Sequence, residues 1–443
     1  MSVLTAARAQ MELSLAFHMV FAALGIGMPV LMVIAEALWL RTGREHYREL
    51  AQKWGKATAL TFAIGAVSGT ALSFELGLLW PRFMAFAGGV IGSAFALEAY
   101  AFFIEAIFLG LYLYGWDRLS PRAHWLTGFP VAISGLMSGV LVLAANAWMQ
   151  APTGFVEGGG ELVSADPLAP FRSPAWLHMA LHSSLSCYIA TGFAVAGVYA
   201  MGMLRGRRDA YHRAALAIAM TVGTVTAAVQ PLSGDLSARR MAEYQPAKLA
   251  AMEAHFETME GAPLIIGGWP DIDQRTVRWA LRIPRGLSWL LERDPNARVE
   301  GLDAVPDELW PNVTITHIAF QVMVACGFAL IALAATFWVA RWRGRADPPR
   351  WLLIALVAGS PLGFLALESG WLVTEVGRQP WVVYGVMRTA DGVTPVADVP
   401  VTLFGFAVLY LALGVALTYL LLRLARPPRG SGPRAHGDPQ RAP

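Results

Sequence analysis

The sequence predicts an all-α fold: a polytopic bundle of about nine membrane-spanning helices. Of the 443 residues, 56% are hydrophobic and only 15% are charged, and the mean hydropathy is +0.48. An ordinary water-soluble domain is far less apolar than this. Apolar segments of about 20 residues, the length that crosses a bilayer as a helix, recur along the chain. Lipid is therefore the expected solvent for most of the protein.

Nine apolar segments are long enough to cross a membrane. Several exceed the minimum length, so we expect their helices to tilt or to protrude. No small-residue cleavage site follows the first segment, which we therefore expect to remain as a span. The predicted spans are residues 12–40, 57–80, 88–115, 124–150, 175–204, 214–236, 313–340, 351–376 and 400–422.

The positions of the basic residues predict the orientation. With the N-terminus outside and the C-terminus in the cytoplasm, five cytoplasmic segments hold 20 of the 34 lysines and arginines. The short outer connections hold only Arg82, Arg172, Arg378 and Arg388. This asymmetry is the one that the positive-inside rule describes. The five cytoplasmic segments are residues 41–56, 118–122, 205–213, 341–350 and 423–441.

The chain divides into four predicted segments. Residues 1–236 hold spans one to six, 237–312 form a long outer loop, 313–425 hold the last three spans, and 426–443 form a tail. The outer loop, about 75 residues long, exceeds an ordinary connector and is expected to be functional. Its stretch PAKLAAMEAHFETME is predicted to be an amphipathic helix. The tail is rich in Pro, Gly and Arg and is predicted to be disordered in the cytoplasm.

Charge and cysteine usage exclude several classes of function. The net charge is only +3, and the basic residues cluster between apolar segments, so a nucleic-acid partner is not expected. Cys187 and Cys326 lie in apolar segments without CxxC or CxxCH spacing. Neither a zinc site nor covalently attached haem is therefore indicated, and both cysteines are predicted to be small buried hydrophobes.

Four side chains that can bind haem iron fall in the outer half of the predicted bundle: His18, His182, Met323 and Glu368. Polar groups are costly within a bilayer, so each is a functional candidate. Histidine with methionine is typical of six-coordinate electron-transfer haems. The simpler alternatives are that each histidine is a hydrogen-bonded core residue and that Met323 fills a gap in packing.

Two further histidines compete with these candidates, and two acids suggest a proton path. His178 lies one helical turn before His182 on the same face, and His317 lies near the start of the seventh span, so spacing alone does not choose among the histidines. Glu98 and Glu105 are seven residues apart, which places them on one helix face about 10 Å apart. Such a pair can relay protons, or it can be satisfied by neighbouring polar groups. Glu36 and Glu75 are weaker candidates of the same kind.

Several motifs resemble one known family. Residues 376–381 read VGRQPW and follow ALESGW. Together with segments from the first to the eighth span, these motifs resemble subunit I of the cytochrome bd quinol oxidases. The further segments are LAFHMVFAALGIGMP, LEAYAFFIEAIFLGLYLYGWDRLSP, VLAANAWMQAP, PAKLAAMEAHFET and VMVACGF.

The resemblance implies specific haem ligands. His182 and Met323 match the axial ligands of a low-spin haem b. His18 and Glu368 match the ligands of two high-spin haems, a second haem b and haem d. Which of these two residues binds which haem stays open. Trp381, in the GRQPW signature, is implied to border a cofactor.

The resemblance also assigns catalytic residues. Lys248 and Glu253 match the quinol-oxidising segment of the outer loop, the Q-loop, and Arg378 belongs to the GRQPW signature. Glu98 and Glu105 match the family's proton-pathway acids. The implied activity oxidises ubiquinol outside and reduces O2 to water with cytoplasmic protons, which contributes to the proton motive force without pumping.

The resemblance implies an assembly in the bacterial inner membrane. Subunit I works there with a second membrane subunit as a heterodimer, together with a small single-span accessory subunit. Three features depart from the common pattern: Gln321 stands where an arginine is usual, the Glu98–Glu105 spacing is one residue shorter, and the outer loop is short. The short loop resembles the cyanide-insensitive branch, in which a further haem b replaces haem d.

Two other functions fit parts of the sequence. A proton-coupled transporter would use the intramembrane acids and histidines without haem, although no internal repeat is visible. A dihaem quinone-dependent electron-transfer subunit would hold haems but would not react with oxygen. The GRQPW context favours the oxidase over both.

Overall fold

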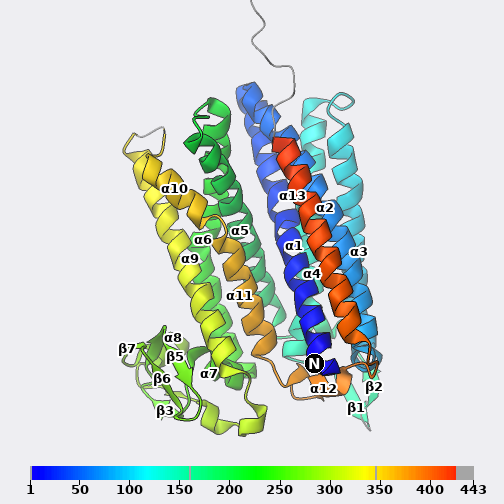
Figure 1. The fold of residues 1–443 in the computed structure, drawn as a ribbon, viewed down its shortest axis with the longest axis vertical. Helices are drawn as coiled ribbons and strands as arrows, with labels where there is room; N and C mark the ends of the chain where they lie inside the picture. The colour runs from blue at the N-terminus through cyan, green and yellow to red at the C-terminus, as the bar shows by residue number, and fades with distance from the viewer. Residues whose placement is uncertain (1, 159–160, 345–346, 426–443) are drawn as a thin grey trace, which may run out of the picture.

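A computed structural model describes residues 2–158, 161–344 and 347–425, and in this part of the chain nine helical spans are long and apolar enough to cross a membrane. They form an elongated bundle of long helices (Figure 1), which confirms the predicted all-α class. The spans are α1 (Val3–Thr42), α2 (Glu45–Leu79), α3 (Pro81–Tyr114), α4 (Pro121–Gln150), α5 (Trp176–Leu204), α6 (Ala210–Tyr244), α9 (Val313–Trp342), α10 (Arg350–Gly359) with α11 (Leu362–Val376), and α13 (Val399–Ala425).

Most helices extend beyond the apolar segments that predict them. Helix α1 begins at Val3 rather than residue 12, because the Ser2 hydroxyl accepts a hydrogen bond from the Thr5 N–H at 3.1 Å and caps the helix. Helix α6 continues to Tyr244, eight residues past the predicted end at residue 236. Once a helix has formed, its backbone hydrogen bonds continue where hydropathy falls, until a cap or a helix breaker ends them.

The eighth span is broken, whereas the sequence predicted one continuous span over 351–376. Helix α10 ends at Gly359 and α11 begins at Leu362. Pro361 lies in the break, where it has no N–H to donate to the helix. The break packs closely against α5, since a Cβ on Gly363 would lie 2.6 Å from the Cα of Ala190.

The outer loop contains short strands that the sequence did not predict. The predicted helix over PAKLAAMEAHFETME ends early: α7 covers only Pro246–Glu253, because Ala254 adopts a left-handed φ of 47°. Three antiparallel pairs follow, β3 with β8, β4 with β7 and β5 with β6. The elements are β3 (Met259–Glu260), β4 (Leu264–Ile266), β5 (Trp269–Asp271), β6 (Thr276–Arg278), β7 (Leu281–Ile283), α8 (Gly286–Glu292), β8 (Arg298–Val299) and the 3-10 turns η2 (Leu302–Ala304) and η3 (Asp307–Leu309).

This loop lies at the end of the bundle that carries the N-terminus, which we call the loop side (Figure 1). Two further small hairpins lie at the same end. The predicted tail, residues 426–443, lies outside the described residues. The remaining elements on the loop side are β1 (Phe155–Gly158), β2 (Glu161–Ala165), the 3-10 turn η1 (Ala169–Arg172), β9 (Trp381–Val383), β10 (Met387–Arg388) and α12 (Thr389–Gly392).

Candidate functional site

The four predicted haem ligands lie on four different helices of the bundle. His18 is on α1, His182 on α5, Met323 on α9 and Glu368 on α11. Helix α11 contacts each of the other three helices, and Figure 1 shows it between α9 and α1. All four side chains are only half-buried. The bundle therefore brings the four helices together, and the four side chains stay partly exposed.

The His18 ring is oriented by a serine on the neighbouring helix. Its Nδ1 lies 3.0 Å from Oγ of Ser68 on α2. The single hydroxyl proton of Ser68 is directed to the backbone carbonyl of Ile64 at 3.0 Å. With that proton on the carbonyl, Ser68 Oγ accepts a hydrogen bond from His18 Nδ1–H, and the imidazole lone pair then lies on Nε2. A neutral imidazole with a free Nε2 lone pair is the form that binds iron.

The His182 ring is held by an equivalent arrangement. Its Nδ1 lies 2.9 Å from Oγ of Ser233 on α6, and Ser233 donates to the Gln230 carbonyl at 2.8 Å. The lone pair again falls on Nε2. Here the Gln230 side-chain amide donates to Nε2 at 3.1 Å. An iron ligand at Nε2 would replace this hydrogen bond, which a flexible glutamine can release.

The two competing histidines have both ring nitrogens engaged. His178 lies 3.1 Å from the Ser237 hydroxyl through Nδ1 and 2.9 Å from the Tyr244 hydroxyl through Nε2. His317 lies between two backbone carbonyls, those of Met252 at 2.7 Å and Gly267 at 3.2 Å. These partners satisfy both histidines within the protein. Engagement of both nitrogens separates His18 from these two histidines. His182 also has both nitrogens engaged, and it differs in that its Nε2 partner is the side-chain amide of Gln230.

Glycines face three of the four candidate ligands. A Cβ on Gly69 would lie 3.0 Å from Cε1 of His18, and one on Gly234 would lie 3.6 Å from Cε1 of His182. A Cβ on Gly370 would lie 3.1 Å from Sδ of Met323. Glycine at these positions lets the neighbouring helix lie close to each ligand-type side chain. The imidazole nitrogens, the thioether and the carboxylate are the donor types that fit haem iron.

Glu368 also fits a missing partner. Its Oε1 is buried and has no hydrogen-bond partner among the described residues. A buried carboxyl oxygen without a partner is costly, so it points to a group that is not part of this chain. Within the described residues, no cluster of three or more His, Cys, Asp or Glu side chains could hold a bare metal ion. The donors thus suit iron that is already held by a macrocycle.

Glu98 and Glu105 both face α4. Ser138 on α4 donates to Glu98 Oε1 at 3.1 Å, and a Cβ on Gly135 of α4 would lie 3.2 Å from Glu105 Oε1. Glu105 is buried, and its Oε1 has no hydrogen-bond partner in the described chain. The two acids therefore follow one another along the α3–α4 interface. The buried acid, Glu105, has a carboxyl oxygen that can still accept a hydrogen bond.

The weaker acidic candidates have partners. Glu75 accepts a hydrogen bond from the Gln10 amide at 3.0 Å. Glu36 lies 2.7 Å from Nδ1 of His124, and both side chains are buried. The His124 Nε2 lies 2.8 Å from the carbonyl of Tyr112, so this histidine connects α1 to α3 and α4. The other carboxyl oxygen of each acid is buried without a partner among the described residues, as in Glu105, so Glu36 and Glu75 stay candidates of the same kind.

A polar network on the loop side joins the predicted residues Lys248 and Arg378. The Lys248 ammonium is buried and donates to Oε1 of Gln150. The Gln150 amide donates to Asn146 Oδ1 at 3.2 Å, and the Asn146 amide donates to Glu375 Oε1 at 2.7 Å. Glu375 then forms an ion pair with Arg378 at 2.5 Å. The outer loop, α4 and the GRQPW turn are thereby connected.

Only the two ends of this network, Lys248 and Arg378, are predicted from the sequence. Asn146 and Gln150 lie in the VLAANAWMQAP motif, four residues apart and so on one helix face. Two side-chain amides at this spacing near the end of an apolar span are a sequence pattern that could have indicated a polar network. Arg378 itself is buried, and its Nε and Nη1 have no partner among the described residues. Such a guanidinium fits an additional anionic group.

Glu253 and Trp381 complete the set of predicted residues. Glu253 is buried on α7, and burial raises the pKa of its carboxyl to about 8. Burial, reinforced by the charge of Arg378, also holds the pKa of Lys248 well below its usual value. Trp381 lies on β9 with the guanidinium of Arg388 over its ring at 5.8 Å. No contact places Trp381 beside the four ligand-type side chains in the described residues.

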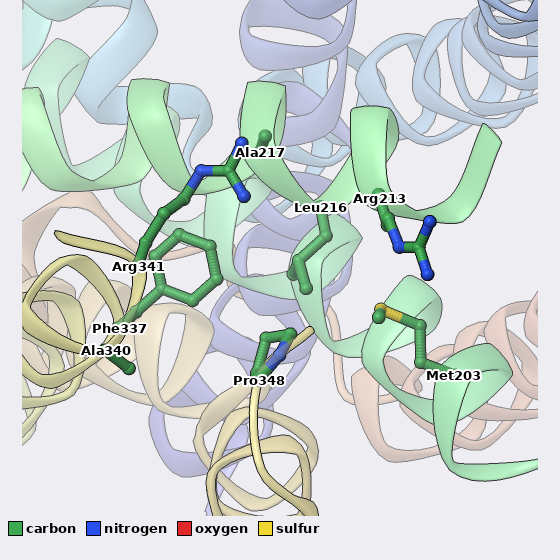
Figure 2. Close-up of a pocket in the computed structure, with 8 residues that line it drawn as sticks. All are labelled: Met203, Arg213, Leu216, Ala217, Phe337, Ala340, Arg341 and Pro348. Atoms are coloured by element: carbon green, nitrogen blue, oxygen red, sulfur yellow. The ribbon is translucent and has the colours of Figure 1, made fainter. Parts of the chain in front are cut away.

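A small pocket at the other end of the bundle holds none of these groups. Figure 2 shows Arg213 and Arg341 at its border, around Leu216 and Phe337. Arg213 is paired with Asp347 at 2.6 Å. The pocket lies between the ends of α5 and α9 and the start of α6, and its lining contains no candidate ligand or relay acid.

Comparison with known proteins identifies the family. The family model described as cytochrome bd terminal oxidase subunit I matches residues 6–428. The chain belongs to this family. A candidate cytochrome bd menaquinol oxidase subunit I of Bacillus subtilis (strain 168) is 38% identical over 95% of this chain and 96% of that protein. The cytochrome bd ubiquinol oxidase subunit 1 of the same strain is 33% identical over 96% of this chain and 93% of that protein.

A solved structure supports the same family. The bd oxidase from Geobacillus thermodenitrificans superposes with a TM-score of 0.90 at 40% identity, covering 95% of this chain and 98% of that chain. The cytochrome bd resemblance seen in the sequence is therefore confirmed. The chain is a multi-pass membrane protein and a subunit of a terminal oxidase, an oxidoreductase of respiratory electron transport.

Proposed function

We propose that this chain is the haem-binding subunit of a quinol:oxygen oxidoreductase. The observation that carries the proposal is the pair of histidines, His18 and His182, each held by a serine so that its lone pair lies on Nε2. His182 and Met323 would ligate a low-spin haem b, and His18 and Glu368 two high-spin haems. Bound haems would supply electron transfer and the reduction of dioxygen to water. The unpartnered guanidinium nitrogens of Arg378 would bind a carboxylate of such a group.

The quinol site is proposed on the loop side. Lys248 lies in a buried network that holds its ammonium in place, and Glu253 has an unpartnered buried Oε2. A carboxyl with a pKa of about 8 can accept a proton from a quinol hydroxyl once it is ionised. Because burial raises this pKa, the acceptor form is present above about pH 8 and is lost as the pH falls below it. The names of the relatives include both ubiquinol and menaquinol, and we propose ubiquinol.

The proton supply is proposed from the opposite side. The basic segments around Arg41, Arg213 and Arg341 favour the cytoplasm for that side, with the N-terminus and the Q-loop outside. Glu105 and Glu98, in series along α3 and α4, would pass cytoplasmic protons inward. Quinol protons released outside and protons consumed from inside would separate charge without a pump.

The assembly and branch are also part of this proposal. The chain would form a heterodimer with a cytochrome bd subunit II, and a small single-span subunit would join it in a bacterial inner membrane. Residues 1–236 and 313–425 would form the bundle, and 237–312 the Q-loop. The shortness of that loop supports the cyanide-insensitive branch, in which a further haem b takes the place of haem d.

The proposal is tested by difference spectroscopy on the purified complex. Dithionite-reduced minus air-oxidised spectra, with and without carbon monoxide, should show a low-spin haem b and a carbon-monoxide-shifted high-spin haem. A red-shifted chlorin band would identify haem d, and its absence would favour the haem b replacement. Intact protein without any haem signal would instead support the transporter, whereas haems that do not respond to carbon monoxide would support the electron-transfer subunit.

A further inference from the structure

One surface of the outer loop is apolar although it is exposed. In the β4–β7 pair, Ile266 faces Leu281 and Leu264 faces Ile283 across the strands. Leu281 is 64% exposed, and Ile266 and Ile283 are also exposed. Two-stranded sheets usually turn a polar face to water. Ile266, Leu281 and Ile283 instead present an apolar surface outside the core, while Leu264 packs against the core of the loop.

The neighbouring β5–β6 pair adds tryptophan and arginine to the same region. Trp269 on β5 lies opposite Arg278 on β6, and both are exposed. Trp279, the next residue, is 87% exposed in a left-handed backbone conformation. Trp269, Arg278 and Trp279 line one open pocket. Tryptophan beside arginine is the composition that membrane proteins place at the lipid headgroup level.

Two residues of α9 fix the height of these strands. The turn between β4 and β5 is bonded to Gln321, whose Oε1 accepts from Gly267 N–H at 2.9 Å and whose amide donates to the Ile265 carbonyl at 3.1 Å. His317 lies 3.2 Å from the Gly267 carbonyl. Gln321, which stands where an arginine is usual, therefore binds the backbone of the Q-loop here. At 1.5 Å per residue, His317 and Gln321 lie about 6 and 12 Å from Val313, the first residue of α9.

That height corresponds to the membrane interface. The 30 residues of α9 span about 45 Å, close to the full thickness of a bilayer with its headgroups. A turn bonded about 6 to 12 Å below the end of such a helix lies beside the headgroup and upper acyl region. Figure 1 accordingly shows β5, β6 and β7 beside the lower end of α9. These strands therefore lie at the depth of the lipid headgroups and not in the bulk aqueous phase.

We propose that the β4–β7 and β5–β6 pairs form an interfacial anchor that seats the Q-loop in the outer leaflet, with phospholipids as the partner. The apolar face would contact acyl chains, and the arginines would bind lipid phosphates. Residues 264–289 carry four arginines against two aspartates, and among the described residues Arg282 and Arg285 form no ion pair. The inference rests on α9 spanning the membrane and not on the oxidase activity.

The test measures the depth of single fluorescent labels in the complete complex. The chain has only Cys187 and Cys326, and both are buried, so the unsubstituted complex gives the labelling background. Trp279→Cys and, independently, Leu281→Cys would carry an environment-sensitive dye. The complex would be placed in phospholipid nanodiscs and exposed either to aqueous iodide or to spin-labelled phospholipid. We expect both labels to be quenched by the lipid and to lose quenching by iodide.

A matched label on the same loop gives the aqueous reference. Glu260→Cys lies on β3, which is exposed and which Figure 1 places at the edge of the loop away from the helices. We expect this label to be quenched by iodide and not by spin-labelled lipid. Iodide quenching at positions 279 and 281 equal to that at 260 would overturn the anchor. Protection of 279 and 281 from both quenchers would also overturn it, since a protein subunit would then cover the surface. Reduced-minus-oxidised spectra of the same nanodiscs report separately on the proposed oxidase.

Discussion

The α1–α2 and α5–α6 pairs hold Nδ1 of their histidines in the same way but differ at Nε2. Ser68 binds Nδ1 of His18, and Ser233 binds Nδ1 of His182. Each serine is followed by a glycine that faces the ring, Gly69 or Gly234. A Ser-Gly pair on an adjacent helix thus binds Nδ1 and lets that helix lie close to the imidazole.

The difference lies in what the protein offers at Nε2. At His182 the Gln230 amide lies 3.1 Å from Nε2. At His18 no described residue makes a hydrogen bond to Nε2. The proposed α5 site also has a second protein ligand in Met323, whereas the α1 site has none. This contrast suits an electron-transfer haem with two protein ligands at α5 and a haem with an open coordination position at α1.

Removing each histidine should have the largest effect. His182→Ala is expected to abolish the low-spin haem b signal, and His18→Ala to remove one high-spin haem while the low-spin signal remains. Both variants should lose quinol-dependent oxygen consumption, because either change interrupts the route from quinol to oxygen. Difference spectra with haem quantification on purified complexes measure the first effect, and an oxygen electrode measures the second.

His178→Gln is the matched control for this pair. His178 lies one helical turn from His182, but the hydroxyls of Ser237 and Tyr244 occupy its two nitrogens. This variant should therefore keep every haem. If His182→Ala left the spectrum unchanged, or if His178→Gln lost the low-spin signal, the choice between the two histidines would be wrong.

Removing the serines should have an intermediate and unequal effect. Ser68→Ala and Ser233→Ala each remove the acceptor for Nδ1–H, and loss of such an outer partner typically costs about 10- to 100-fold in metal affinity. The loss should be greater for Ser68→Ala, since the proposed α5 haem keeps Met323 as a second ligand. The rate of haem transfer to an excess of apomyoglobin measures the loss of haem affinity in each variant. The midpoint potential of each haem measures whether its ligand has changed.

Ser186→Ala controls for loss of a serine inside the bundle. Ser186 lies on α5, the helix of His182, and its hydroxyl donates to the Ser183 carbonyl at 2.7 Å rather than to a histidine. Its removal should change neither haem retention nor potential. Equal haem retention in all three serine variants would show that the serine–histidine hydrogen bonds do not support the ligands.

The number of spans and the choice of polar side chains could be predicted from the sequence because both depend on local composition. Twenty-residue apolar segments and the rarity of charge within them identify the helices and make residues such as Glu98 visible. Ser68 and Ser233 carried no such signal, because serine is common in membrane helices and these two act on histidines 50 and 51 residues away. Their role appears only when the helices are packed.

The outer loop was predicted least well. Strands of three residues, such as β4 and β7, are too short to show a period, and their pairing joins Ile266 to Leu281 across an intervening hairpin. The helix predicted past Glu253 ends because Ala254 takes a left-handed conformation that its residue type does not suggest. The broken eighth span is different, because Pro361 was a visible breaker inside the predicted segment.

Alanine at the two ring-facing glycines gives the smallest and most selective effect. A Cβ at position 69 would lie 3.0 Å from His18 Cε1, so the ring must shift by a few tenths of an ångström. A Cβ at position 234 would lie 3.6 Å from His182 Cε1, which is an ordinary van der Waals contact. Gly69→Ala should therefore shift the absorption and midpoint potential of the haem at His18, whereas Gly234→Ala should leave the low-spin haem unchanged. Gly77→Ala on α2, where a Cβ would meet nothing within 4 Å, separates this contact from the general effect of alanine in a helix. Equal shifts in Gly69→Ala and Gly77→Ala would mean that the position of the His18 ring does not control its haem.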